Sequence, residues 1–141
     1  MARTINTKIK AALLAAAAVA GLAVTATPAQ ALSYCNAGGG GVYICEYGIT
    51  SYSFPDGTKQ QFVIGADTAV WTRWTNTSGT WSKWLSMGGK STSKVSIHDG
   101  VRPDTDPWTF AVLYYAADGY ARENYRDHNG NWSGWKVVDD F

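Results

Sequence analysis

Two copies of the sequence Trp-Ser-x-Trp constrain the fold of this chain more than any other feature. They occupy residues 81–84 and 132–135. When residues 62–87 are aligned with residues 113–138, an Ala-Asp pair and a turn glycine also coincide. A repeat unit of only a few strands cannot bury its apolar face alone, so its stability depends on neighbouring copies or on a partner. The repeat therefore favours a binding or assembly protein over an enzyme.

Residues 1–31 have the pattern of a signal peptide. Arg3, Lys8 and Lys10 precede an Ala-rich apolar stretch at residues 11–26, and residues 27–31 supply the small-x-small pattern that a signal peptidase needs. A membrane anchor would require about 20 apolar residues, and this stretch is shorter. We therefore expect residues 1–31 to be removed and the mature chain to be secreted, with an extracellular location and no membrane span.

The charge and aromatic content of the expected mature chain bear on its partners. Removing residues 1–31 takes away three of the 12 basic side chains and none of the 11 acidic ones, which leaves a net charge of −2. The remaining basic residues are scattered, so a nucleic-acid partner is disfavoured. All 19 Trp, Tyr and Phe residues lie after residue 31, and this density exceeds what one small core can enclose. We expect some of the rings to lie at a surface where they bind something.

Cys35 and Cys45 are the only cysteines, and an even count in an exported chain predicts one disulfide. Closing this loop would stabilise the fold by about 2.8 kcal/mol on the chain-entropy model. Two cysteines are too few for a structural zinc site. A reactive pair is the alternative, but no helix N-terminus or basic neighbour is present to lower a thiol pKa.

We expect an antiparallel all-β fold, either a compact sandwich or a partial propeller built from the two tandem repeats. Helical periodicity is absent after residue 31, whereas segments rich in β-branched and aromatic residues alternate with glycine-containing turns. The expected strands are residues 42–47, 49–54, 60–64, 69–76, 81–87, 94–99, 108–116, 120–127 and 132–138.

The chain divides into a Gly-rich, disulfide-closed N-terminal arm at residues 32–47 and a β domain at residues 48–141, whose repeats are residues 62–89 and 113–138. Four consecutive glycines predict a mobile arm or a tethered loop, because exposed termini are usually poorly ordered. If the arm binds a partner by adding backbone hydrogen bonds, its contact residues would be Leu32, Tyr34, Gly38, Gly39, Gly40, Gly41 and Tyr43.

The sequence argues against catalysis and against a bound metal or cofactor. His98 and His128 lie in no metal-ligand spacing or recognisable triad and are expected in turns. Glu46 and Glu123 are the only glutamates, and glycoside hydrolysis would need a second carboxylate, such as that of Asp67 or Asp118. These two aspartates have a simpler role as turn residues. The sequence Asp104-Thr105-Asp106 suggests calcium, but further oxygen ligands cannot be assigned, so we expect a solvated loop.

Each Trp-Ser-x-Trp segment follows a strand and a polar turn. Two indoles three residues apart cannot both lie on one face of a regular strand, so one is expected to pack inward and the other to lie at an edge or bulge. The same reasoning applies to Trp71 and Trp74. The serine between the indoles can satisfy a backbone group at the kink. At least half of these tryptophans are expected to pack between sheets, and an exposed indole is a platform for a sugar ring or an apolar side chain.

Residues 62–89 and 113–138 resemble the blades of secreted bacterial β-propeller lectins, whose repeats commonly end in a Trp-Ser-x-Trp element followed by a Gly-Gly turn; Gly88-Gly89 matches in the first copy only. The resemblance implies carbohydrate binding in equivalent shallow pockets lined by Trp71, Arg73, Trp74, Arg122, Asn124 and Tyr125. Together with Trp81, Trp84, Trp132 and Trp135, these residues are the expected ligand or partner surface.

A propeller needs about four blades to close, and this chain has two repeats. Its sheets must be completed by a sandwich, by an oligomer or by docking onto another protein. The whole layout resembles the small adapter subunit of secreted umbrella toxin particles, which implies that the chain joins a lectin-bearing subunit to a large toxin polypeptide. A protease-docking or inhibitor protein is a third hypothesis, but residues 38–41 are four glycines, and such a loop is not preorganised.

Overall fold

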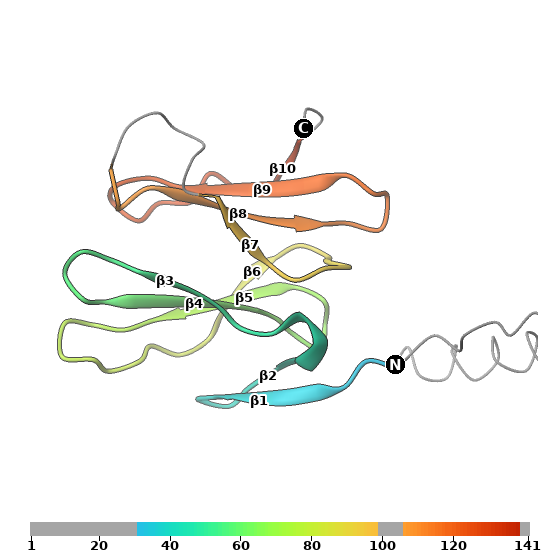
Figure 1. Cartoon of the computed structure of the whole chain (residues 1–141), viewed down its shortest axis with the longest axis horizontal. Coiled ribbons are helices and arrows are strands. Elements are labelled where there is room, and N and C mark those ends of the chain that lie inside the picture. Colours follow the sequence, from blue (N-terminus) through green and yellow to red (C-terminus); the bar gives the residue numbers. More distant parts are fainter. Residues whose placement is uncertain (1–30, 99–105, 139–141) are drawn as a thin grey trace, which may run out of the picture. The chain divides into compact units, whose positions relative to one another are not determined.

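Antiparallel β-strands make up nearly all of the regular structure in the described residues. The computed structural model describes residues 31–98 and 106–138, so the predicted signal peptide lies almost entirely outside the described residues, as do Asp104 and Thr105. An N-terminal hairpin pairs β1 with β2 and is followed by two four-stranded sheets, in the order β3-β4-β5-β6 and β10-β9-β8-β7 (Figure 1). The elements are β1 (Tyr34–Gly38), β2 (Gly41–Ile44), the 3-10 turn η1 (Cys45–Tyr47), β3 (Thr50–Ser53), β4 (Lys59–Ile64), β5 (Val70–Trp74), β6 (Leu85–Gly88), β7 (Ser96–His98), β8 (Phe110–Tyr115), β9 (Ala121–Arg126) and β10 (Lys136–Val138).

The two four-stranded sheets are copies of one meander. The sequence offset between the two Trp-Ser-x-Trp segments also separates the first residue of β4 from that of β8, β5 from β9, and β6 from β10. Neighbouring strands in each sheet are antiparallel. The expected all-β fold built from two tandem repeats is therefore confirmed, and the described residues contain no closed propeller. We call β3–β6 the first sheet and β7–β10 the second sheet.

The main hydrophobic core lies between these two sheets. Phe62 and Ile64 from β4 are fully buried in one cluster with Phe110 and Val112 from β8. The rings of Phe62 and Phe110 meet edge to face at 6.0 Å, a favourable geometry for an aromatic pair. Alternation along each strand puts these residues on one face, so the core fixes how the second sheet packs on the first.

The segment expected as a mobile arm or a tethered loop is an ordered N-terminal hairpin. Disulfide Cys35–Cys45 joins β1 to η1 with the two Cα atoms 5.2 Å apart, which confirms the predicted bridge. The hairpin contacts the first sheet through an isolated bridge between Tyr43 and Gly65. Gly39 and Gly40 form its turn with positive φ, and a Cβ on Gly41 would lie 2.4 Å from the indole nitrogen of Trp84. The glycines thus allow a tight turn and close packing.

Three expected local features differ from the structure. Residues 45–47 form the 3-10 turn η1 instead of continuing a strand. His98 ends β7, which agrees with the strand expected at residues 94–99 and not with the turn expected for this histidine. The Trp-Ser-x-Trp segments do not belong to strands either. Strands β6 and β10 begin at the residue after each segment, because the serine side chain interrupts the backbone ladder there.

Candidate functional site

The same hydrogen bonds shape both Trp-Ser-x-Trp segments. Ser82 Oγ accepts a hydrogen bond from the backbone N–H of Trp74 at 3.0 Å, and Ser133 Oγ accepts the equivalent bond from Tyr125 at 3.0 Å. Each serine N–H donates in turn to the carbonyl of the same strand residue. The serine hydroxyl thereby accepts the strand N–H that a backbone carbonyl would accept in a regular sheet, as expected from the sequence. The segment bends at this serine, and in the first copy both indoles, Trp81 and Trp84, contact the Arg73 guanidinium.

The indole N–H of the second tryptophan in each segment joins that sheet to the preceding layer. Trp84 donates to the Gly38 carbonyl in β1 at 2.8 Å, and Trp135 donates to the Met87 carbonyl in β6 at 2.7 Å. Trp132 adds edge-to-face contacts with the rings of Phe62 and Phe110. Trp84, Trp132 and Trp135 therefore hold neighbouring layers together.

Arg73 is also structural. Its guanidinium donates to the Gln61 side chain and to the Ala37 carbonyl, each at 2.9 Å. It lies over the rings of Trp81 and Trp84, with centroid distances of 4.3 and 4.8 Å. Desolvation lowers the pKa of Arg73, although the group remains charged at any physiological pH. This cation and its two rings fasten the hairpin to the first sheet.

A cleft of about 490 Å³ opens between the first and second sheets, and we call it the inter-sheet cleft. Its walls combine aromatic side chains with polar ones, and the side chains of Trp74, Leu85, Trp108 and Trp132 in the lining are partly or fully exposed. Trp74 is 43% exposed and lies directly across the β4–β5 ladder from Gln60. Concave apolar surfaces with a few polar groups are the usual form of ligand sites.

Two nearly buried amides line this cleft, and each has one end without a partner in the described residues. Gln60 and Asn124 are both 4% exposed. Gln60 Nε2 donates to the Thr72 hydroxyl, which itself donates to the Gln61 carbonyl, so Oε1 is the free end. Asn124 Oδ1 accepts from the N–H of Gly134, so Nδ2 is the free end. No fully buried side-chain atom in the described residues lacks a partner, so both free ends are accessible.

Arg126 is the only charged side chain among the described residues that line the cleft. Its Nη1 donates to the Trp108 carbonyl at 2.5 Å, and its guanidinium lies 4.7 Å from the ring centroid of Phe54. Burial lowers the pKa of Arg126, while nearby carboxylates, Asp127 first among them, act in the opposite direction. The cation is thus held in place by a carbonyl and an aromatic ring.

The structure does not bring the six predicted sugar-binding residues together. Trp74 and Asn124 line the inter-sheet cleft, whereas Trp71 lines a second hollow of about 560 Å³ between the hairpin and the first sheet. The indole N–H of Trp71 donates to Asp67 at 3.0 Å. At the equivalent place in the second repeat, Arg122 forms an ion pair with Asp118 at 2.7 Å. The described residues therefore do not form the expected equivalent pockets. The corresponding positions Trp71 and Arg122 carry different side chains, which form different hydrogen bonds and ion pairs.

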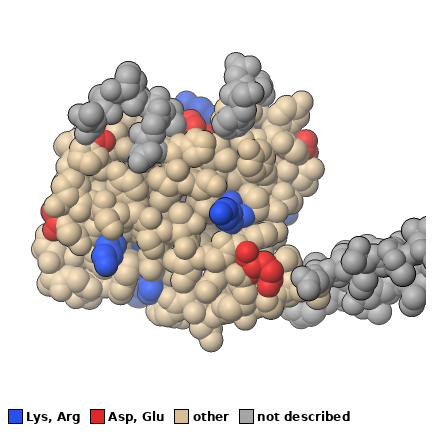
Figure 2. Space-filling view, viewed as in Figure 1, with Lys and Arg blue, Asp and Glu red and all other residues tan. Residues whose placement is uncertain are grey.

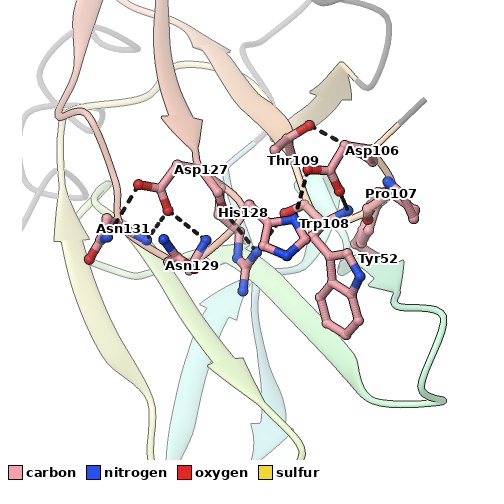
Figure 3. Close-up of polar contacts among 10 residues, drawn as sticks. Tyr52, Asp106, Pro107, Trp108, Thr109, Asp127, His128, Asn129 and Asn131 are labelled. Carbon is pink, nitrogen blue, oxygen red and sulfur yellow. Dashed lines mark hydrogen bonds and ion pairs between the residues drawn. The ribbon is translucent and has the colours of Figure 1, made fainter. Parts of the chain in front are cut away.

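The carboxylates of Asp106 and Asp127, next to the cleft, accept hydrogen bonds from residues of the nearby turns. Asp106 Oδ2 lies 2.8 Å from His128 Nδ1, and the N–H of Trp108 together with this histidine lowers the pKa of the Asp106 carboxyl (Figure 3). Asp127 accepts from the N–H groups of Asn129 and Asn131, and the Asn131 contact is the main cause of its lowered pKa (Figure 3). Groups of three or more metal-ligating side chains are absent from residues 31–98 and 106–138.

The exposed apolar residues lie at several separate places. Tyr34 and Val42 are exposed on the hairpin, and Leu32 is exposed just before it. Tyr115 and Tyr120 are exposed at the β8–β9 turn. Lysine and arginine side chains are scattered over the face shown in Figure 2. Sequence reasoning missed Gln60, Tyr115 and Tyr120, although the repeat alignment could have singled out the two tyrosines.

No protein-family model and no curated protein matches this chain. In the part of the chain that the structure describes, no helix is long and apolar enough to cross a membrane.

Proposed function

We propose that this chain is a secreted, non-catalytic adapter that bridges protein partners in an extracellular complex. The observation that carries the proposal is a difference between equivalent positions of the two sheets. Ile64 and Ala69 of the first repeat are 0% and 7% exposed, whereas their counterparts Tyr115 and Tyr120 are 46% and 54% exposed. The second sheet thus presents large aromatic side chains where the first sheet is covered.

The exposure of Tyr115 and Tyr120 supports the proposal that this surface contacts a protein partner. A terminal repeat that faces only water usually carries polar residues on its outer surface. Tyrosine is instead enriched at protein–protein interfaces, because its ring buries apolar area while its hydroxyl forms hydrogen bonds. A partner that packs on Tyr115 and Tyr120 would complete the repeat stack.

The N-terminal hairpin supplies the second surface. Tyr34 is exposed, and Val42 is exposed where it lines the second hollow, while Ala37 between them in sequence is buried. The hairpin is anchored by the disulfide and by Trp84, so it would present these side chains without a large ordering cost. Two surfaces on different layers are what a bridging protein needs, and the resemblance to the adapter subunit of umbrella toxin particles suggests the kind of assembly.

Affinity capture of the tagged protein from culture medium, followed by mass spectrometry, tests the proposal. Wild-type protein should recover two partners. Tyr115→Ser with Tyr120→Ser should lose one of them, and Tyr34→Ser with Val42→Ser should lose the other. Leu85→Ser is the matched control, because Leu85 is also exposed but lies in the inter-sheet cleft. Recovery of the bait alone, or of the same partners with every variant, would contradict bridging through these surfaces.

A further inference from the structure

We propose that the inter-sheet cleft binds the ring of a sugar, with Trp74 as the stacking platform and with Gln60 and Asn124 as its hydrogen-bonding partners. This site is separate from the bridging surfaces proposed above. Trp74 and Gln60 belong to the first sheet and Asn124 belongs to the second, so a ligand would be held between the two repeats.

The free amide ends are the first reason. Gln60 Oε1 is an acceptor and Asn124 Nδ2 is a donor, and neither has a partner in residues 31–98 or 106–138 although each side chain is 4% exposed. Both free ends are accessible at the cleft, so a ligand hydroxyl can bond with them in place of water. The amides cannot simply rotate to exchange their ends, because the Thr72 hydroxyl and the Gly134 N–H fix their orientation.

The platform is the second reason. Trp74 is paired with Gln60 across the β4–β5 ladder, so an exposed indole stands beside the free acceptor on one sheet face. Directly paired side chains in an antiparallel sheet lie about 5 Å apart, which is the scale of one sugar ring. A ring whose C–H face packs on the indole would therefore have its hydroxyls near the amide groups.

The first repeat provides an internal comparison. Its position equivalent to Asn124 is Arg73, whose side chain is bonded to Gln61 and to Ala37. In the second repeat, the position equivalent to Gln60 is Ala111, which has no polar side-chain atom. Among the described residues, the two free amide ends occur together only between the two sheets. The equivalent positions carry other side chains, so packing of the repeat does not by itself require these amides.

The chemistry of the free groups favours hydroxyls. A hydroxyl both donates and accepts, so neighbouring hydroxyls of one ring can satisfy Gln60 Oε1 and Asn124 Nδ2 together. Arg126, the cation of the described cleft lining, already contacts a carbonyl and an aromatic ring, so the cleft does not require an anionic ligand. The described lining residues include no carboxylate, which would otherwise select a cation.

Binding of the purified protein to a printed array of bacterial, fungal and plant oligosaccharides tests the proposal, followed by tryptophan-fluorescence titration with the oligosaccharide that binds. Trp74→Ala should weaken binding about tenfold or more. Asn124→Asp keeps the acceptor that faces Gly134 but removes the free donor, and it should also weaken binding about tenfold. Asn36→Asp, at an exposed position outside the cleft, should change the affinity by less than about twofold.

Thermal unfolding of each variant shows whether its fold is retained, and Asn124→Asp provides a second variant if Trp74→Ala does not fold. The proposal is overturned if no oligosaccharide on the array binds. It is also overturned if binding of the oligosaccharide is unchanged in both cleft variants. None of these results bears on the bridging function, which depends on other residues.

Discussion

Trp84 and Trp135 occupy equivalent positions in the two repeats, and each donates its indole N–H to a backbone carbonyl of the preceding layer. The acceptors are the carbonyls of Gly38 and Met87, at 2.8 and 2.7 Å. The contact between the hairpin and the first sheet is therefore equivalent to the contact between the first sheet and the second sheet. The chain repeats an interface as well as a sheet, and the last sheet has no successor among the described residues.

Replacing these indoles should weaken the interfaces selectively. Trp135→Phe removes the bond to Met87 and should lower the free energy of unfolding by about 1 kcal/mol or more, because a carbonyl loses its donor. Trp84→Phe should speed amide hydrogen exchange mainly in β1 and β2. Urea unfolding and hydrogen exchange measure both effects. Trp74→Phe is the control, since Trp74 is exposed, and an equal loss of stability in this variant would contradict the assignment.

The two serines should contribute equally, since each satisfies one strand N–H. Ser82→Ala and Ser133→Ala leave the N–H of Trp74 or Tyr125 without its acceptor. We expect each to lower the free energy of unfolding by about 1 kcal/mol. Ser51→Ala, at an exposed position of β3, should have almost no effect in the same urea titration. A neutral result for both Ser82→Ala and Ser133→Ala would show that the bent segments form without these bonds.

Removing the disulfide should loosen the hairpin before the sheets. Cys35→Ala with Cys45→Ala should lower the stability by about 2.8 kcal/mol on the chain-entropy model. The loss should be seen as faster hydrogen exchange in β1 and β2, while β4 and β8 stay protected. Uniform loss of protection in all strands would mean that the hairpin and the sheets unfold as one unit.

Asp127 should make the protein sensitive to acid. Its folded-state pKa is lowered, chiefly by the Asn131 N–H, so its charge stabilises the fold above the unfolded pKa of about 3.9. This stabilisation is lost as the pH falls through the lowered value. Asp127→Asn should reduce the melting temperature at neutral pH, and the difference from wild type should vanish in acid.

The first repeat provides the reverse test, because Asn76 Oδ1 accepts the N–H groups of Ser78 and Thr80 as Asp127 accepts those of Asn129 and Asn131. Asn76→Asp should make the melting temperature depend more strongly on pH below about 4. If neither substitution changes the pH profile, the two turns do not contribute to acid sensitivity.

The repeat and the strands could be predicted from the sequence because both depend on local patterns. The repeat offset, the glycine turns and the β-branched segments define β4, β5, β8 and β9 without any tertiary information. The ordered hairpin could not be predicted in this way. It is held by Arg73 and Trp84, which lie in the first sheet and its bent segment, far from the glycines in sequence, and composition alone suggests mobility.

The candidate site was predicted only in part for the same reason. Trp74 and Asn124 were expected at a ligand surface, and both line the inter-sheet cleft. Equivalence between repeats suggested two similar pockets, but Arg73 and Asn124 occupy the same position with different partners. Gln60 gains its importance only through the Thr72 hydroxyl, which leaves its oxygen free, and no sequence pattern shows that contact.

The mass of the native protein, measured directly on material purified from culture medium, tests most directly whether the repeat stack is completed by another molecule. The proposed function predicts a particle heavier than one chain, with the β8–β9 turn protected from hydrogen exchange relative to the isolated polypeptide. A monodisperse monomer with no other component, whose Tyr115 and Tyr120 remain open to solvent, would contradict it.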